Sequence, residues 1–301
     1  MKVLVAGGTG FIGRRLCTEL ADRGHDVTAL ARSPDDAALP NTVETAMGDV
    51  SAYESIESHF EGQDVAVNLV ALSPLFKPKG NLSHEAVHLQ GTKNVVRACE
   101  EHGVDRLVQM SALGADPNAA TAYLRTKGQA EDVVRSSALD SVIFRPSVVF
   151  GDGGEFVAFT KKLTTPYVTG FPGGGKTPFQ PIWIEEFVPM MADAVEDDDH
   201  DGHAYEIGGP EVLTLADVAR LAYAAEGKSL TIVPIPLSLA KVGATVAGAL
   251  PFFPFGPDQI RSLKEDNRVA DNDVAAFGVE PDELTTLASY LGVENPAKVT
   301  G

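Results

Sequence analysis

Short apolar runs alternate with amphipathic stretches along the first half of the chain. Six runs have the length and composition of buried strands, at Val3–Ala6, Asp26–Ala31, Val43–Met47, Asp64–Leu69, Arg106–Met110 and Ser141–Arg145. The stretches between them follow helical periodicity, at Phe11–Arg23, Tyr53–Phe60, Leu82–His102 and Thr121–Ala138. Strands that alternate with helices form parallel sheets covered on both faces, so the pattern predicts an α/β fold with a doubly wound parallel sheet.

The second half is less regular, because glycine and proline become frequent from Gly151 onward. Trp183–Ala194 predicts a strand and a helix that return to the sheet, and Ala204–Ile207 predicts a late strand. A further helix is predicted from Thr214 to Ala225, where Thr214 is a good N-cap. We expect residues 1–155 and a return segment, 178–225, to form the sheet domain. Residues 156–177 and 226–296 then form a smaller, mainly helical substrate lobe, followed by a tail, 297–301.

Composition narrows the classes of partner. Lys and Arg number 24 against 42 Asp and Glu, which gives a net charge of -18 that repels nucleic acid and anionic membranes. Such acidity also suits a salt-adapted protein, because salt screens the self-repulsion. The cysteines are Cys17 and Cys99, so a cytoplasmic protein without disulfides is expected.

Two apolar segments bear on membrane targeting. Val3–Ala6 has a strand's length, so we expect no signal sequence. Val242–Phe255 is interrupted by glycine and proline and falls short of the ~20 residues that a transmembrane helix needs. It is expected either to pack inside the C-terminal part or to form a contact surface.

Three glycines follow the first apolar run at a regular spacing, as Gly7, Gly10 and Gly13. A strand that leads through a glycine turn into a helix leaves backbone N–H groups free at the positive end of the helix dipole, where a pyrophosphate can bind. The spacing therefore predicts a dinucleotide site, whose demands are a tight turn, close approach of the ligand and close helix packing.

Further motifs join the glycines in a resemblance to a known family. They are Gly48-Asp49-Val50, Gly91-Thr92-Lys93-Asn94, Tyr123-Leu124-Arg125-Thr126-Lys127 and Arg145-Pro146-Ser147-Val148-Val149-Phe150-Gly151. Together they resemble the extended and atypical short-chain dehydrogenase/reductase superfamily, which includes NAD(P)-dependent epimerases and dehydratases. Met110–Ala115 and Gly173–Ile182 resemble most the branch with the reductase-like accessory subunit of respiratory complex I. The resemblance is strong over residues 1–210 and implies a Rossmann domain that binds NAD(P).

The end of the second strand bears on the choice of cofactor. NAD-preferring proteins usually place a carboxylate there to bind the ribose hydroxyls, whereas this chain has Arg32. An arginine can pair with a 2′-phosphate, so NADP is favoured and NAD is the alternative. Asp49 resembles the family's adenine contact and is also a good N-cap. The expected cofactor-binding residues are Gly7, Gly10, Phe11, Ile12, Gly13, Arg32, Asp49, Val50, Leu69, Val70, Ala71, Ser111, Tyr123, Lys127, Pro146 and Val148.

Tyr123 and Lys127 are the candidate catalytic residues. Four residues apart on one helix, they share a face, and a lysine charge lowers a phenol's pKa toward the working pH. The family's serine or threonine that holds the substrate oxygen falls at Leu113, and its helix asparagine is replaced by His88. Ser111 is a potential substitute, although the equivalent serine in relatives lies closer to the nicotinamide.

Other motifs favour ordinary structural roles. Gly170–Thr177 matches a phosphate-binding loop for ATP, but Pro178 and Pro181 exclude the helix that such a loop needs. The acidic run Glu196–Asp201 is expected to be a solvated loop, and His84 with His88 lacks a further metal ligand, so no metal site is expected.

Two functions remain open. The first is an oxidoreductase or epimerase-type enzyme that uses Tyr123 and Lys127 on an unknown small carbonyl, hydroxyl or quinone-related substrate. The second is a nucleotide-binding accessory or sensor subunit, without catalysis, linked to respiratory complex I or quinone metabolism. The helices Leu82–His102 and Thr121–Ala138 form dimers in many relatives, so a homodimer and a respiratory-complex partner are the alternatives for assembly.

Overall fold

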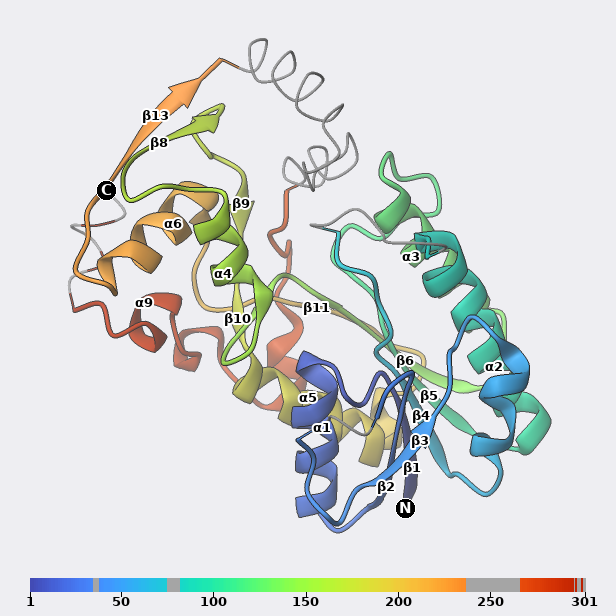
Figure 1. The fold of residues 1–301 in the computed structure, drawn as a ribbon. Coiled ribbons are helices and arrows are strands. Elements are labelled where there is room, and N and C mark those ends of the chain that lie inside the picture. Colours follow the sequence, from blue (N-terminus) through green and yellow to red (C-terminus); the bar gives the residue numbers. More distant parts are fainter. Residues whose placement is uncertain (35–37, 75–81, 237–265, 295, 297–298, 300–301) are drawn as a thin grey trace. The chain divides into compact units, whose positions relative to one another are not determined.

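The computed structural model describes residues 1–34, 38–74, 82–236, 266–294, 296 and 299 (Figure 1). The chain divides into two compact units. Unit 1 consists of Met1–Ser73, Pro78–Arg145 and Ile184–Glu206; unit 2 consists of Pro74–Lys77, Pro146–Trp183 and Ile207–Gly301. The apolar segment Val242–Phe255 lies outside the described residues.

Unit 1 is built on a parallel sheet with the strand order β11-β6-β5-β4-β1-β2-β3. Its strands are β1 (Lys2–Ala6), β2 (Asp26–Ala31), β3 (Glu44–Met47), β4 (Val65–Asn68), β5 (Arg106–Met110), β6 (Asp140–Pro146) and β11 (Ala204–Ile207). The order runs outward in both directions from β1, whose Val3 pairs with Val27 and Val65. This is the predicted doubly wound sheet, which places a switch point at the carboxyl end of β1.

Helices cover both faces of this sheet. In Figure 1, α1 (Phe11–Asp22) and α5 (Ile184–Glu196) lie on one face, and α2 (Gly91–His102) and α3 (Ala122–Arg135) lie on the other. Under α2 the core includes Leu4, Phe60 and Leu107, none exposed by more than 1%. Full burial of such a side chain stabilises the fold by about 2 kcal/mol.

Ion pairs join α1 to α5. Arg23 at the end of α1 binds Asp193 and Glu196 of α5, both at 2.7 Å, and Arg15 pairs with Glu185 at 3.0 Å. The segment after Trp183 is therefore the helix α5, which these ion pairs hold beside α1 on the sheet.

Unit 2 has its own apolar core. Phe150, Phe156, Phe171 and Leu221 are among the residues packed there, with no more than 6% of each exposed. The α-helices in its described residues are α4 (Glu155–Lys162), α6 (Leu215–Ala224) and α9 (Leu287–Tyr290). The strands described there are β7 (Val149–Phe150), β8 (Tyr167–Pro172), β9 (Pro178–Phe179), β10 (Ile182–Trp183), β12 (Leu213–Thr214) and β13 (Leu230–Ile235).

The predicted boundaries need several corrections. The expected strand at Trp183 is β10, which pairs with β7 and not with the main sheet. Residues 146–155, 178–183 and 207–225, expected with the sheet, belong to unit 2. Phe150, Phe179 and α6 pack in the apolar core of that unit. The helix predicted to start at Thr214 is confirmed, with Thr214 and Asp217 forming a reciprocal capping box.

Two predicted helices depart from regular α-helix. Tyr53–Phe60 forms two 3₁₀ helices, Tyr53–Ser55 and Glu57–Phe60, because the Ser55 hydroxyl bonds locally to backbone carbonyls. The helix predicted at Leu82–His102 begins as a π-helix, Glu85–Gln90, which continues into α2. Single turns of π-helix inside α-helices are frequently found at functional sites.

The loop that matches an ATP-binding motif has no helix after it. Residues 170–177 form the end of β8 and a turn, and β9 starts at Pro178. The remaining short helices are Asp198–His200, Asp273–Phe277 and Pro281–Glu283. No helix in the described part of the chain combines the length and apolarity required to span a bilayer.

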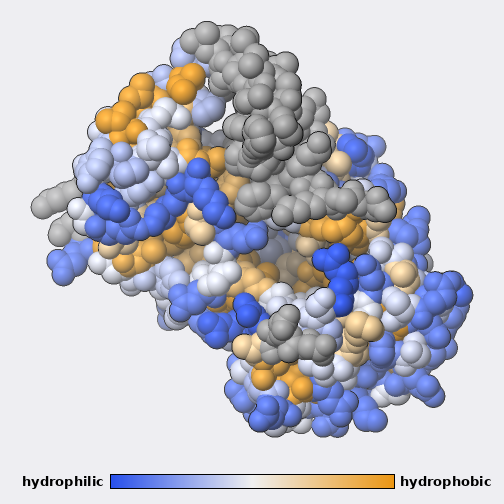
Figure 2. Space-filling model, viewed as in Figure 1, coloured by the Kyte–Doolittle hydropathy of each residue, from blue (hydrophilic) through white to orange (hydrophobic). Residues whose placement is uncertain are grey.

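The surface differs between the two units. Hydrophilic residues dominate the face of unit 1 around α2 and α3, whereas hydrophobic residues gather over β8 and β13 of unit 2 (Figure 2). The latter group includes Tyr167, Val168 and Val233, which are 60%, 57% and 47% exposed.

Candidate functional site

The glycine turn joins β1 to α1 at the switch point of the sheet. Gly7 has a left-handed φ of +85°, and its N–H donates to the Leu30 carbonyl at 2.9 Å. Gly10 is the N-cap of α1 and has no side chain to bond the first turn, so the N–H groups there are open to a ligand.

Gly13 serves helix packing. A Cβ atom at this position would lie 2.2 Å from the Gly7 carbonyl oxygen and 2.8 Å from the Gly8 Cα. Glycine is therefore required for α1 to approach the turn this closely.

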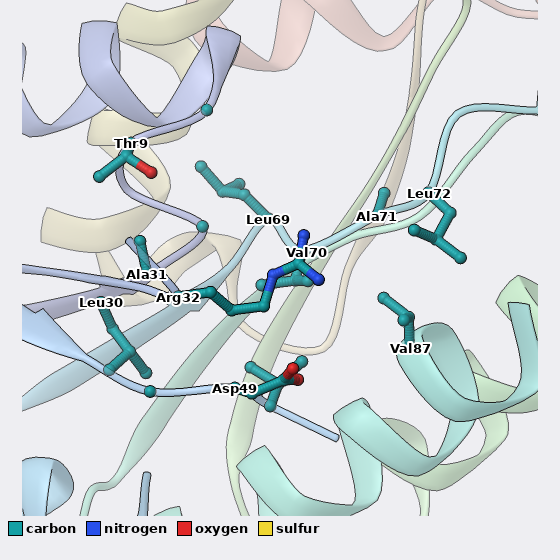
Figure 3. A pocket seen from close by; sticks show the side chains of 14 residues that line it. Thr9, Leu30, Ala31, Arg32, Asp49, Leu69, Val70, Ala71, Leu72 and Val87 are labelled. Atoms are coloured by element: carbon teal, nitrogen blue, oxygen red, sulfur yellow. The ribbon is translucent and has the colours of Figure 1, made fainter. Parts of the chain in front are cut away.

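A pocket of about 230 Å³ opens beside this turn, within unit 1 (Figure 3). It lies along the carboxyl ends of β1, β2, β3 and β4. Its lining residues are Gly7, Thr9, Gly10, Leu30, Ala31, Arg32, Gly48, Asp49, Val50, Leu69, Val70, Ala71, Leu72 and Val87. Pockets of this kind, at the switch point of a doubly wound sheet, hold nucleotides.

Arg32 is the basic group among the residues that line this pocket. Its side chain projects from the end of β2 into the pocket, over the apolar wall made by Leu69 and Val70 (Figure 3). None of the described residues forms an ion pair with it.

Asp49 lies across the pocket from the glycine turn. Its Oδ1 accepts hydrogen bonds from the Ser51 N–H (2.9 Å) and hydroxyl (2.7 Å). These bonds fix the carboxylate in a turn at the pocket wall. The predicted N-cap role of Asp49 is wrong, because the 3₁₀ helix that follows has Ala52 at its N-cap and no side-chain cap.

Tyr123 and Lys127 lie on α3, which Thr121 caps by accepting a bond from the Leu124 N–H. Lys127 is only 2% exposed, and its Nζ donates to the Met110 carbonyl oxygen at 2.7 Å. Burial lowers the pKa of Lys127 to about 8, against the opposing effect of Glu131.

The predicted lowering of the Tyr123 pKa is wrong for this arrangement of side chains. Burial raises the pKa of the Tyr123 phenol to about 12. The Lys127 ammonium is directed to the Met110 carbonyl, and desolvation of the phenol decides the direction of the shift.

Ser111 is bound to a buried carboxylate. Its hydroxyl donates to Glu131 Oε1 at 2.5 Å, and the Arg145 guanidinium donates to both oxygens of Glu131, at 2.8 and 2.5 Å. Ser111 and Glu131 are 4% and 3% exposed. A serine has one hydroxyl proton, so Ser111 cannot donate to a substrate while it bonds Glu131.

Leu113 and His88 occupy the two positions at which the resemblance led us to expect a serine or threonine and an asparagine. Leu113 is buried, with 5% exposed, and offers no hydrogen bond from its side chain. The His88 Nε2 accepts the Leu72 N–H at 2.9 Å, and its ring lies edge-on to the Tyr123 ring with centroids 5.4 Å apart.

Half of the expected cofactor residues line the pocket: Gly7, Gly10, Arg32, Asp49, Val50, Leu69, Val70 and Ala71. Phe11, Ile12 and Gly13 lie in the first turn of α1, and Ser111, Tyr123 and Lys127 lie around the ends of β5 and α3. Pro146 and Val148 belong to unit 2.

Six lining residues were not expected: Thr9, Leu30, Ala31, Gly48, Leu72 and Val87. Thr9, Ala31, Gly48 and Leu72 directly adjoin predicted contacts, and Leu30 lies two residues before Arg32, so their positions in the sequence were a usable signal. Val87 lies on the π-helix, which the periodicity does not reveal.

Among the described residues, Asp197, Asp198 and Asp199 are close enough together to share a cation. All three are exposed, and Asp197 accepts a bond from the Asp199 N–H. They belong to the acidic run that was expected to be a solvated loop.

Comparison with known proteins now identifies the family. A family model described as NAD(P)H-binding matches residues 7–167, which include the glycine turn, Arg32, Tyr123 and Lys127. The chain belongs to this NAD(P)H-binding family.

Individual relatives confirm the resemblance to the short-chain dehydrogenase/reductase superfamily and its complex I branch. The chain is 29% identical to mitochondrial NADH dehydrogenase (ubiquinone) 1 alpha subcomplex subunit 9 of Arabidopsis thaliana, over 89% of this chain and 71% of that protein. It is 31% identical to 2-alkyl-3-oxoalkanoate reductase of Stenotrophomonas maltophilia, over 52% of this chain and 53% of that protein.

The fold agrees with a solved structure. The UDP-glucose 4-epimerase of Thermus thermophilus, in complex with NAD, matches with a TM-score of 0.73 and 22% identity, over 99% of both chains. The doubly wound Rossmann sheet is thereby confirmed.

Proposed function

We propose that the protein is an accessory subunit or assembly partner of a respiratory redox complex, and that it holds NADP(H) as a bound ligand without reducing a substrate. The observation that carries the proposal is the contrast between an open dinucleotide pocket and a reaction end whose hydroxyl and ammonium groups are bonded within the protein.

The preference for NADP(H) over NAD(H) rests on Arg32. A guanidinium in the pocket at the end of β2 can pair with a 2′-phosphate on the adenosine ribose, and the lining contains no carboxylate on β2 for ribose hydroxyls. The glycine turn would hold the pyrophosphate, and Asp49 and Val50 would lie beside the adenine.

The absence of turnover rests on three side chains. Reduction of a carbonyl by this superfamily needs a hydroxyl to hold the substrate oxygen and a phenol to donate a proton. Leu113 supplies no hydroxyl, and the Ser111 hydroxyl donates its proton to the hydrogen bond with Glu131. The pKa of Tyr123 is raised to about 12, which makes the phenol a weaker proton donor. When bound, the nicotinamide would supply a hydride to a substrate carbon, but none of these three side chains is set to hold the substrate oxygen and protonate it.

The role in a complex is supported by how far each relative matches. The relative named as a respiratory-complex subunit aligns over 89% of this chain, whereas the one named as a reductase aligns over 52%. The similarity to the respiratory-complex subunit therefore covers more of this chain than the similarity to the reductase.

An oxidoreductase is the second candidate, because Tyr123 and Lys127 are both present on one face of α3. That function requires the Ser111–Glu131 bond to open or the substrate to bring its own proton donor.

The test of cofactor preference compares NADPH and NADH binding, by fluorescence titration, in the wild-type protein and in Arg32→Ala. Loss of a charge-assisted pair should weaken NADPH binding about 10- to 100-fold and leave NADH binding unchanged. Arg97→Ala, which removes an arginine from the exposed face of α2, is the matched control. Equal weakening of both cofactors, or of neither, would contradict the assignment of Arg32.

A further inference from the structure

One imidazole joins the wall of the dinucleotide pocket to the helix that carries Tyr123. His88 lies on the π-helix, is 1% exposed and makes two hydrogen bonds from opposite sides of its ring. Nε2 bonds the Leu72 N–H at 2.9 Å, and Nδ1 lies 3.1 Å from the Thr126 hydroxyl oxygen on α3.

The two bonds fix the tautomer of the ring. A backbone N–H can only donate, so Nε2 is the acceptor and carries no proton. The single proton of the Thr126 hydroxyl is directed to the carbonyl oxygens of Ala122 (2.8 Å) and Tyr123 (3.1 Å), so the hydroxyl oxygen accepts from the His88 Nδ1–H. Burial, with the nearby charge of Lys127, lowers the pKa of His88 to about 2, which keeps the ring neutral.

The ring therefore connects the pocket wall, through Leu72, to α3, through Thr126. Leu72 is the last of four consecutive residues, Leu69–Leu72, that line the pocket beyond β4, and Val87 beside His88 also lines it. On the other side, Thr126 lies between Tyr123 and Lys127 along α3, and the Tyr123 ring packs edge-on against the His88 ring.

The direction of the sheet shows which half of a dinucleotide this wall meets. In the proposed binding mode the pyrophosphate would lie at the glycine turn after β1, and the adenosine half would lie by Arg32 and Asp49 at the ends of β2 and β3. The other half must then extend over β4, where Leu69–Leu72 form the wall.

We propose that His88 is a positioning residue, which holds the Leu69–Leu72 wall against α3 through the Leu72 N–H and so fixes the pocket for the nicotinamide half of NADP(H). It stands where related enzymes are expected to carry an asparagine, whose shorter side chain does not reach as far as an Nε2 atom. This inference rests on the proposed NADP(H) binding.

The experiment uses two substitutions, each of which keeps one of the two hydrogen-bonding positions of the His88 ring. His88→Gln retains an acceptor at the place of Nε2, and His88→Asn retains a donor at the place of Nδ1. The probes are NADPH and adenosine 2′,5′-bisphosphate, which contains the adenosine half alone. Affinities are measured by calorimetry on the full-length protein, and thermal unfolding checks that both variants fold.

We expect His88→Asn to weaken NADPH binding about tenfold, as expected for one lost hydrogen bond, and His88→Gln to weaken it less than threefold. Bisphosphate binding should be unchanged in both. Exchange of the Leu72 amide hydrogen should be faster in His88→Asn than in His88→Gln, which a general loss of stability would not produce.

Other outcomes overturn the inference in distinguishable ways. If both variants bind NADPH as the wild type does, or if both probes weaken equally, His88 does not position the nicotinamide wall. If the wild-type protein binds neither probe, the proposed NADP(H) binding itself fails and the role of His88 falls with it.

Discussion

The glycine turn and the end of β5 lie at the same edge of one sheet, yet their polar groups are used differently. At the turn, Gly7 and Gly10 line a pocket, and α1 begins beside it with no side-chain cap on its first N–H groups. At the end of β5, Ser111 and Lys127 are bonded to Glu131 and to the Met110 carbonyl. The first region is built to receive a ligand, and the second is already satisfied by the protein.

The satisfied region extends across the sheet as a hydrogen-bonded network. Asn68 donates to Thr92 (3.3 Å) and Gln109 (3.0 Å), and Gln109 donates to the Met110 carbonyl that also accepts from Lys127. A buried polar network in which each member is bonded makes the structure rigid. Residues of the kind found in active sites can therefore serve stability, and their presence alone is weak evidence for catalysis.

The largest expected loss of stability comes from removing the charge of Glu131, which accepts hydrogen bonds from Ser111 and Arg145. Glu131→Gln leaves Arg145 and Ser111 without their charged partner, and should lower the free energy of unfolding by about 3 kcal/mol. Urea unfolding measures this loss.

The control is Glu101→Gln, since Glu101 pairs with Arg97 on the exposed face of α2. Its urea midpoint should stay at the wild-type value. A loss of stability in Glu131→Gln no greater than in this control would mean that the buried cluster is not a stabilising unit.

Two glycine substitutions separate the role of the glycine turn in folding from its role in binding. Gly13→Ala places a Cβ 2.2 Å from the Gly7 carbonyl oxygen, and should destabilise the fold by about 2 to 3 kcal/mol through overpacking. Gly10→Ala meets that same oxygen at 3.2 Å and adds a methyl group to the pocket lining. It should leave the melting temperature nearly unchanged and weaken NADPH binding at least tenfold. Equal effects of the two variants on both properties would show that the turn does not separate these roles.

A smaller effect concerns pH. The pKa of Lys127 is about 8 in the folded protein against an ordinary value of 10.5, so the unfolded chain binds more protons between these values. Stability from this group therefore rises with pH above 8, by at most about 1.4 kcal/mol per pH unit.

Cys17 and Cys99 lower the stability as the pH rises above 9, because burial raises their pKa values to about 12 and the folded protein keeps their protons longer than the unfolded chain does. The measurement is therefore the difference in unfolding free energy between wild type and Lys127→Met from pH 8 to 9. A flat difference would show that Lys127 is not held in a desolvated site.

Much of the fold was predictable from the alternation of strands and helices. Each of the six predicted strands is present, since buried parallel strands are marked by short runs of apolar residues that do not depend on distant contacts. The π-helix at Glu85–Gln90 and the pairing of β10 with β7 were not predictable, because both follow from tertiary packing.

The site divides in the same way. The glycine turn, Arg32 and Asp49 are local to strand ends, and the sequence places them correctly at the pocket. The bonds of Ser111 to Glu131 and of His88 to Leu72 join residues 20 and 16 positions apart, on different elements. Motif spacing does not reveal that these groups are already bonded, and that is the information which separates a ligand-holding site from a reacting one.

The most direct test is a single-turnover measurement of NADPH bound to the full-length protein. The NADPH-loaded protein is mixed with a panel of small carbonyl compounds and quinones, and loss of nicotinamide fluorescence is followed in wild type and in Tyr123→Phe. We expect bound NADPH to be oxidised no faster than free NADPH, with the same rate in both proteins. Oxidation at least 100-fold faster than in solution, and abolished by Tyr123→Phe with NADPH affinity intact, would contradict the assignment of a held ligand and establish an oxidoreductase.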